Sequence, residues 1–78
     1  MSNLEKYVDA FVKALEISKE EVPALVYGQS ASWDSVGHMT VVAYLEDAFD
    51  IMMEMDDIID LSSFERGKEI LRKYDVEI

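Results

Sequence analysis

Apolar side chains recur every three or four residues along the first part of the chain, which is the period of an amphipathic helix. The positions are Leu4, Tyr7, Val8, Phe11, Val12 and Leu15. This spacing predicts a helix over residues 2–15. Ser2 or Asn3 can cap its first turn, and Glu5 stands where the helix dipole favours an anion.

The segment after this helix lacks the same period. Pro23 and Gly28 interrupt regular structure, and residues 29–32 have the composition of a loop. Ser18 and Glu21 have the three-residue spacing of a capping box, which predicts a single helical turn. Four apolar residues in the segment indicate that it packs against the core. They are Val22, Leu25, Val26 and Tyr27.

A second helix is predicted to begin at Asp34 and Ser35, because an aspartate at the N-cap accepts a hydrogen bond from an amide one turn in. Its buried stripe consists of Val41, Val42, Leu45 and Phe49. The acidic residues on its other faces are Glu46, Asp47 and Asp50. We expect the helix to stop near Asp50.

Residues 55–61 predict a short third helix or an irregular turn. Ser62 or Ser63 then caps a last helix that runs to about Tyr74. The side chains that it turns inward are Phe64, Ile70, Leu71 and Tyr74. Without a convincing period-two segment, the predicted fold is all-α: a small antiparallel four-helix bundle, with three longer helices, one short helix and a long loop between the first two. Residues 1–78 are expected to form a single domain.

The charge is strongly acidic and unevenly distributed. Seventeen acidic residues against seven basic ones give a net charge of −10, and no Lys or Arg lies between Lys19 and Arg66. Such a field repels phosphate backbones and anionic lipid and attracts basic protein surfaces, although a solubilising surface without a partner is the alternative. We also expect salt or divalent cations to relieve repulsion within one acidic group. It comprises Glu46, Asp47, Asp50, Glu54, Asp56 and Asp57.

The chain offers few groups for catalysis of its own. It has no cysteine and one histidine, which excludes disulfides, a thiolate nucleophile and a metal site built from Cys or paired His. Ser35 and His38 stand one helical turn apart, but a working dyad also needs an orienting acid and oxyanion donors. The acids lack the spacing of a calcium loop. We therefore expect neither enzymatic activity nor a metal.

Targeting signals are also missing from the sequence. The first residues carry no apolar signal core, and no apolar run approaches the ~20 residues of a membrane span. The expectation is a cytoplasmic monomer that neither inserts into membranes nor binds nucleic acid.

The start of the second helix carries a candidate site for modification. A serine in the first turn presents its hydroxyl beside unpaired amides, where a phosphate ester is stabilised. Alone, Ser35 is also consistent with an ordinary polar residue that follows its cap. The wider pattern is Asp34-Ser35-Val36, then Leu45-Glu46-Asp47-Ala48-Phe49, an acidic turn over residues 54–60 and a final helix over residues 64–74. In this pattern the chain resembles the acyl carrier proteins of the phosphopantetheine-binding carrier family.

The resemblance implies that Ser35 is the attachment site of 4′-phosphopantetheine, which a phosphopantetheinyl transferase takes from coenzyme A. Asp34 then caps the helix and is recognised by that transferase. Cargo is held as a thioester on the arm, so the working sulfur is imported. The implied function is to carry acyl groups for fatty-acid, lipid or polyketide-type biosynthesis. Two alternatives stay open: an aminoacyl carrier, such as a D-alanyl carrier loaded by an adenylating ligase, and an acidic helical adaptor without the arm.

In the family the second helix docks partner enzymes. The docking candidates here are Val36, Met39, Thr40, Ala43, Glu46, Asp47 and Glu54. Attraction between these acids and basic surfaces on acyl-loading and acyl-processing enzymes raises the rate of encounter. For Met39, core packing is an equally weighted alternative.

Several positions depart from the family pattern. Val36 replaces a leucine and Thr40 replaces an acid, which suggests a specialised carrier. Trp33 either packs the loop onto the bundle or lines the approach to the arm. Gly37 costs ~0.5–1 kcal/mol relative to alanine inside a helix, and it either admits the arm or a partner backbone or is merely tolerated. His38 is expected to be solvent-exposed, where it could pair with the phosphodiester or sense pH.

Overall fold

Helices form most of the chain, and the all-α prediction is confirmed. The computed structural model describes residues 2–29 and 31–78, so that Ser30 of the predicted loop lies outside the described residues. The elements are α1 (Asn3–Leu15), the 3₁₀-helix η1 (Lys19–Ala24), α2 (Ser35–Phe49), α3 (Met55–Asp60) and α4 (Phe64–Arg72). Among the residues described, no helix combines the length and apolar character that crossing a membrane requires.

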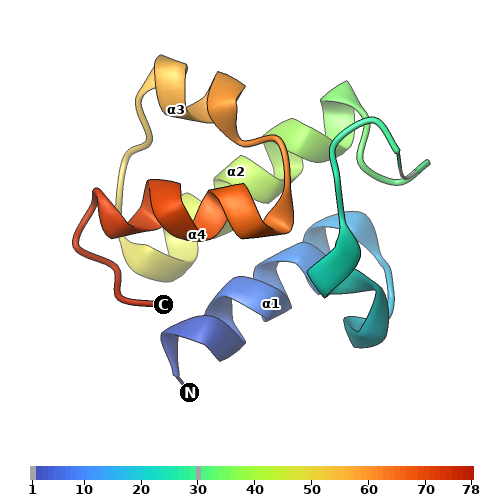
Figure 1. Cartoon of the computed structure of the whole chain (residues 1–78), viewed down its shortest axis with the longest axis horizontal. Helices are drawn as coiled ribbons and strands as arrows, with labels where there is room; N and C mark the ends of the chain where they lie inside the picture. The colour runs from blue at the N-terminus through green and yellow to red at the C-terminus, as the bar shows by residue number, and fades with distance from the viewer. Residues whose placement is uncertain (1, 30) are drawn as a thin grey trace.

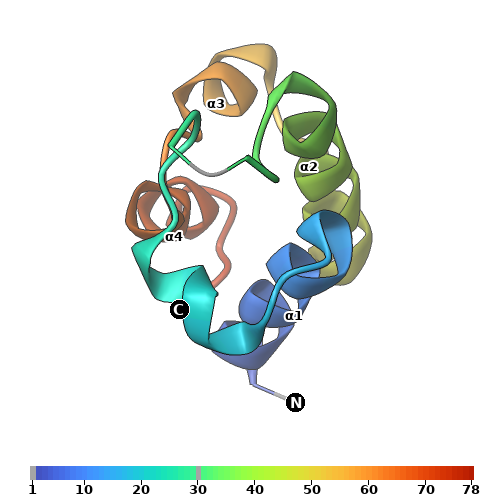
Figure 2. The same ribbon diagram turned by 90° about the vertical axis from the view of Figure 1, so that its right-hand side faces the viewer.

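The four α-helices surround one apolar interior (Figure 1). α1 and α2 pack side by side and run in opposite directions, while α3 and α4 close the other sides (Figure 2). η1 contacts both α1 and α4. The ends of the chain meet where the Asn3 amide Nδ2 donates to the Glu77 carbonyl at 3.0 Å.

Side-chain caps define the starts of α1, α2 and α4, as the sequence predicts. Ser2 Oγ accepts from the Glu5 amide at 3.1 Å, and the Glu5 carboxylate accepts from the Ser2 amide at 2.9 Å. These two bonds complete a capping box at α1. Ser63, rather than Ser62, caps α4 by accepting from the Arg66 amide at 3.0 Å.

A helical element is present after Ser18, where the sequence predicts one, but η1 has six residues and is therefore longer than the single turn predicted. The Glu21 carboxylate accepts from the Ser18 amide at 3.1 Å. Pro23 lies inside this helix instead of interrupting it, so that prediction is wrong. The reason is local, because the fixed φ of proline, near −65°, falls within the range of a 3₁₀-helix.

Aromatic rings form the centre of the core between α1 and α4. The ring of Tyr7 stacks on Phe64 with centroids 4.7 Å apart, and its hydroxyl donates to the Phe64 carbonyl at 2.6 Å. Phe11 meets both Phe64 and Trp33 edge to face. Gly67 makes room for this cluster, since a Cβ there would overlap the Tyr7 hydroxyl.

Two features near the ends of helices differ from the sequence prediction. α4 stops at Arg72 instead of Tyr74, because the amides of Tyr74 and Val76 both donate to the Leu71 carbonyl and close a turn. Phe49, predicted to be buried, is half-buried because it is the last residue of α2.

Candidate functional site

Asp34 and Ser35 form the start of α2 as the sequence predicts. Asp34 Oδ1 accepts from the Gly37 amide at 2.8 Å, and the Asp34 carbonyl accepts from the His38 amide at 2.8 Å. Ser35 is the first helical residue and is exposed to solvent. In a helix the amides of this first turn have no partner within the helix, so those of Ser35 and Val36 remain at its open end.

The loop before α2 is held down by Trp33. Its side chain is 0 % exposed and meets Phe11 edge to face, with ring centroids 5.2 Å apart. The Trp33 carbonyl also accepts from the Gly28 amide at 3.3 Å. Of the two roles predicted for Trp33, packing of the loop onto the bundle is the one that the structure supports.

Gly37 allows a close approach, but of the chain to itself. A Cβ at this position would overlap the Ser32 carbonyl oxygen and would lie 3.0 Å from Leu15 Cδ2. The loop before α2 and the end of α1 therefore occupy the space that a side chain would need. This corrects both sequence interpretations, in which Gly37 either admits the arm or a partner backbone or is merely tolerated.

His38 is not solvent-exposed, and that prediction is wrong. Its ring is half-buried between the loop and α3. Trp33 Nε1 donates to His38 Nδ1 at 3.0 Å, and His38 Nε2 lies 2.7 Å from the Ile58 carbonyl oxygen. Tertiary packing decides this, because Ile58 is twenty residues away along the chain. With both ring nitrogens engaged, the imidazole is not directed at the Ser35 hydroxyl.

The predicted docking residues divide into two groups. Val36 and Met39 are 75 % and 55 % exposed, which places Met39 on the surface rather than in the core. Ala43, Asp47 and Glu54 are exposed as well.

Thr40 and Glu46 are half-buried and take part in the fold itself. Thr40 Oγ1 donates to the Val36 carbonyl at 3.0 Å. The Glu46 carboxylate accepts from the Met53 amide at 2.9 Å, which anchors the segment that leads to α3. Glu46 therefore has a structural role that the sequence did not indicate.

Sequence reasoning missed several exposed apolar side chains near this surface. They are Tyr44, Met52, Met55 and Ile59. Met55 and Ile59 stand four residues apart on α3, and therefore on one face, and are 68 % and 72 % exposed. The bond between His38 and Ile58 joins α3 to the first turns of α2. The three- and four-residue spacing of positions 52, 55 and 59 is a signal that could have revealed this face.

Asp57 was predicted to be one of several mutually repelling surface acids, and this is wrong. It is only 7 % exposed and accepts from Lys73 Nζ and from the Tyr74 hydroxyl, both at 2.5 Å. The hydrogen bond from Lys73, followed by that from Tyr74, lowers the pKa of the Asp57 carboxyl. Because the Tyr74 oxygen also accepts from the Glu54 amide at 2.9 Å, this group ties α3 to the end of α4.

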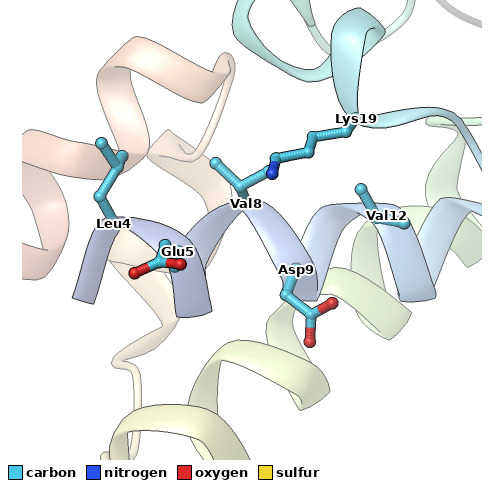
Figure 3. A pocket seen from close by; sticks show the side chains of 6 residues that line it. All are labelled: Leu4, Glu5, Val8, Asp9, Val12 and Lys19. Atoms are coloured by element: carbon cyan, nitrogen blue, oxygen red, sulfur yellow. The ribbon is translucent and has the colours of Figure 1, made fainter. Parts of the chain in front are cut away.

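One surface hollow lies beside the site, and another lies away from it on α1. One, of about 700 Å³, lies between the end of α1 and the start of α2 and is lined by residues on both sides of Ser35, including Asp34 and Val36. The other, of about 290 Å³, is formed by α1 and Lys19 of η1, with no lining residue from α2. Figure 3 shows the Lys19 side chain extending from η1 toward Val8, one of the apolar side chains that line this second hollow. They are Leu4, Val8 and Val12.

Comparisons with known proteins add no relative to this picture. No protein-family model, no curated protein and no solved structure matches the chain. The function is therefore inferred from the sequence pattern and from the geometry at the start of α2.

Proposed function

We propose that the chain is an acyl carrier protein that holds acyl groups as thioesters on a 4′-phosphopantetheine arm attached to Ser35. The observation that carries this proposal is the exposed Ser35 side chain on the first residue of a fifteen-residue helix that Asp34 caps. The same helix contains the Leu45-Glu46-Asp47-Ala48-Phe49 segment of the carrier pattern.

The surroundings of Ser35 suit a phosphodiester. The amides of Ser35 and Val36 and the positive end of the α2 dipole favour an anion at this oxygen. The hollow of about 700 Å³ beside the residue leaves room for a flexible chain. When bound, the group would supply a thiol for thioester formation, a function that no side chain of this cysteine-free protein can perform.

The exposed face of α2 suits short-lived docking to basic enzymes. Val36 and Met39 offer apolar contacts, and the exposed acids Asp47, Asp50 and Glu54 lie on the same helix or just beyond it. Long-range attraction from such acids speeds encounter, while a small contact area permits release. A carrier that must visit several enzymes needs both properties. Met55 and Ile59 extend the apolar surface onto α3.

The proposal is tested by intact mass after incubation with coenzyme A and a promiscuous phosphopantetheinyl transferase. We expect the phosphopantetheine adduct on the wild-type chain and none on Ser35→Ala. Ser32→Ala is the matched control, because Ser32 is exposed and only three residues away, and it should be modified like the wild type. An unmodified wild type, or an equal adduct on Ser35→Ala, would contradict the proposal and favour an adaptor without the arm.

The class of cargo is read separately, from the thioester on protein isolated from its native cells. Release with hydroxylamine followed by mass analysis distinguishes an acyl group from an aminoacyl group. We expect an acyl hydroxamate; an aminoacyl hydroxamate would contradict this assignment while leaving Ser35 as the attachment site.

A further inference from the structure

The two bonds to His38 define which of its nitrogens carries a proton. An indole N–H can only donate, so His38 Nδ1 must accept the bond from Trp33. A carbonyl oxygen can only accept, so His38 Nε2 must donate to Ile58. Both conditions hold only for the neutral imidazole with its proton on Nε2.

A second proton on this ring would break the bond to Trp33. It would sit on Nδ1 and point at the indole N–H, so that two donors would face each other at a separation that is now 3.0 Å. The Trp33 side chain is 0 % exposed, so its N–H would be left without an acceptor unless the indole moved. The bond from Nε2 to the Ile58 carbonyl would persist.

Three parts of the chain meet at this ring. Trp33 belongs to the loop before α2, His38 to α2 and Ile58 to α3. The rings of Trp33 and His38 stack with centroids 6.0 Å apart, and Tyr27 meets His38 edge to face at 5.0 Å. Ser35 lies one turn before His38 on the same helix, so this junction holds the helix start on which Ser35 stands.

The charged groups around the junction are committed to other partners. Asp34, at the start of α2, accepts from the Gly37 amide. On α3, Asp57 bonds Lys73 and Asp60 bonds Arg66. From the loop, the titratable side chain that faces the imidazole is Tyr27, whose ring meets it edge to face. Among the groups that face this ring, His38 is therefore the one whose protonation would reach Trp33 directly.

We propose that Trp33, His38 and Ile58 form an acid-sensitive latch, closed while the imidazole is neutral and opened by its protonation. Opening frees the loop before α2 and loosens the helix start that carries Ser35. His38 thus acts as a positioning residue for the modification site. The latch does not depend on the arm, because every contact in it is made by residues of the chain itself.

Intrinsic fluorescence reports on the latch directly, because the chain has a single tryptophan and a single histidine. As the pH falls from about 8 to about 5, we expect Trp33 emission to shift to longer wavelength and its quenching by acrylamide to rise about twofold or more. Far-UV circular dichroism should stay nearly constant. His38→Gln keeps one acceptor and one donor that do not titrate, and should show no such step.

Two fluorescence results would overturn the latch: a wild-type emission that stays constant over this range, or a step of the same size and midpoint in His38→Gln. If His38→Gln does not fold, a measurement on the wild-type protein still tests the latch. Nitrogen NMR of the imidazole should show the proton on Nε2 at pH 8, and a proton on Nδ1 would exclude the latch. Neither readout involves Ser35, so failure here is distinct from failure of the carrier proposal.

Discussion

Between α1 and α4 the contact is aromatic and apolar, whereas α3 adds hydrogen bonds with polar side chains to the apolar contact of Ile58. On the first side, Tyr7 and Phe64 stack with their centroids 4.7 Å apart, and the one polar bond there, from Tyr7 Oη, is itself buried. On the second, the Ile58 carbonyl oxygen lies 2.7 Å from His38 Nε2, and the Asp57 carboxylate accepts hydrogen bonds from Lys73 and Tyr74.

The difference teaches which part of the molecule should respond to solution conditions. Burial of apolar surface changes little with pH or ionic strength near neutrality, while bonds to titratable side chains change with both. We therefore expect α3 to detach at a lower free energy than the pair α1–α4. Four predictions test this contrast.

The largest effect is expected for Gly67→Ala, which attacks the aromatic side. The new Cβ would overlap the Tyr7 hydroxyl and would lie 2.8 Å from Leu61 Cδ1. We expect a loss of about 3 kcal/mol in the free energy of unfolding, from overpacking and from the displaced hydrogen bond. Urea unfolding measures it. The exposed position Glu65→Ala on the same helix serves as the control, and a loss at Gly67 below about 1 kcal/mol would show that Tyr7 can move aside.

A smaller effect is expected for Asp57→Asn, which weakens the polar side. The loss at pH 7 should be about 1 kcal/mol, since Asn removes the carboxylate charge and leaves one acceptor oxygen for the two donors, Lys73 Nζ and the Tyr74 hydroxyl. Because Lys73 lowers the pKa of the Asp57 carboxyl, its contribution is present above the usual value of 3.8 and is lost as the pH falls through the lowered one. The stability difference between wild type and variant should therefore vanish in strong acid.

Asp56→Asn is the control for this pH profile, because Asp56 is the exposed neighbour. Chemical unfolding of the three proteins between pH 7 and pH 2 gives the comparison. A difference between wild type and Asp57→Asn that persists unchanged at the lowest pH would mean that the charge of Asp57 does not hold α3.

Substitutions of the neighbouring acids Glu46 and Asp47 distinguish a structural role, in holding the segment before α3, from a role in docking partner enzymes. Glu46→Ala removes the acceptor of the Met53 amide and should cost about 1 kcal/mol, whereas Asp47→Ala should stay within about 0.5 kcal/mol of the wild type. Asp47→Lys should fold normally yet slow loading by the transferase at low salt. Thermal unfolding and loading kinetics measure the two effects. Equal stability losses, or unchanged loading, would remove the distinction.

The smallest effect is expected from salt. Asp57 is neutralised by Lys73, but the exposed acids Asp47, Asp50, Glu54 and Asp56 still repel one another. Raising the ionic strength should therefore increase Tm by about 2–5 °C. A decrease would indicate that ion pairs such as Asp57–Lys73 outweigh this repulsion. Differential scanning calorimetry of the wild type at several salt concentrations decides between them.

What the sequence by itself determined are the features that depend on neighbours within one helical turn. The capping box at Ser2 and Glu5 and the cap of α2 at Asp34 link residues three apart. The apolar period of α1 is equally local. For the same reason the position of Ser35, first in its helix and exposed, could be predicted without a structure.

The tertiary structure alone decided where the polar side chains find distant partners. His38 reaches Ile58 across twenty residues, Asp57 reaches Lys73 across sixteen, and Gly37 meets the Ser32 carbonyl and Leu15. Each of these residues looked like part of a solvated or tolerant surface. A polar residue on a helix can face water or a partner with the same local pattern, and only the packing of one helix against another selects between the two.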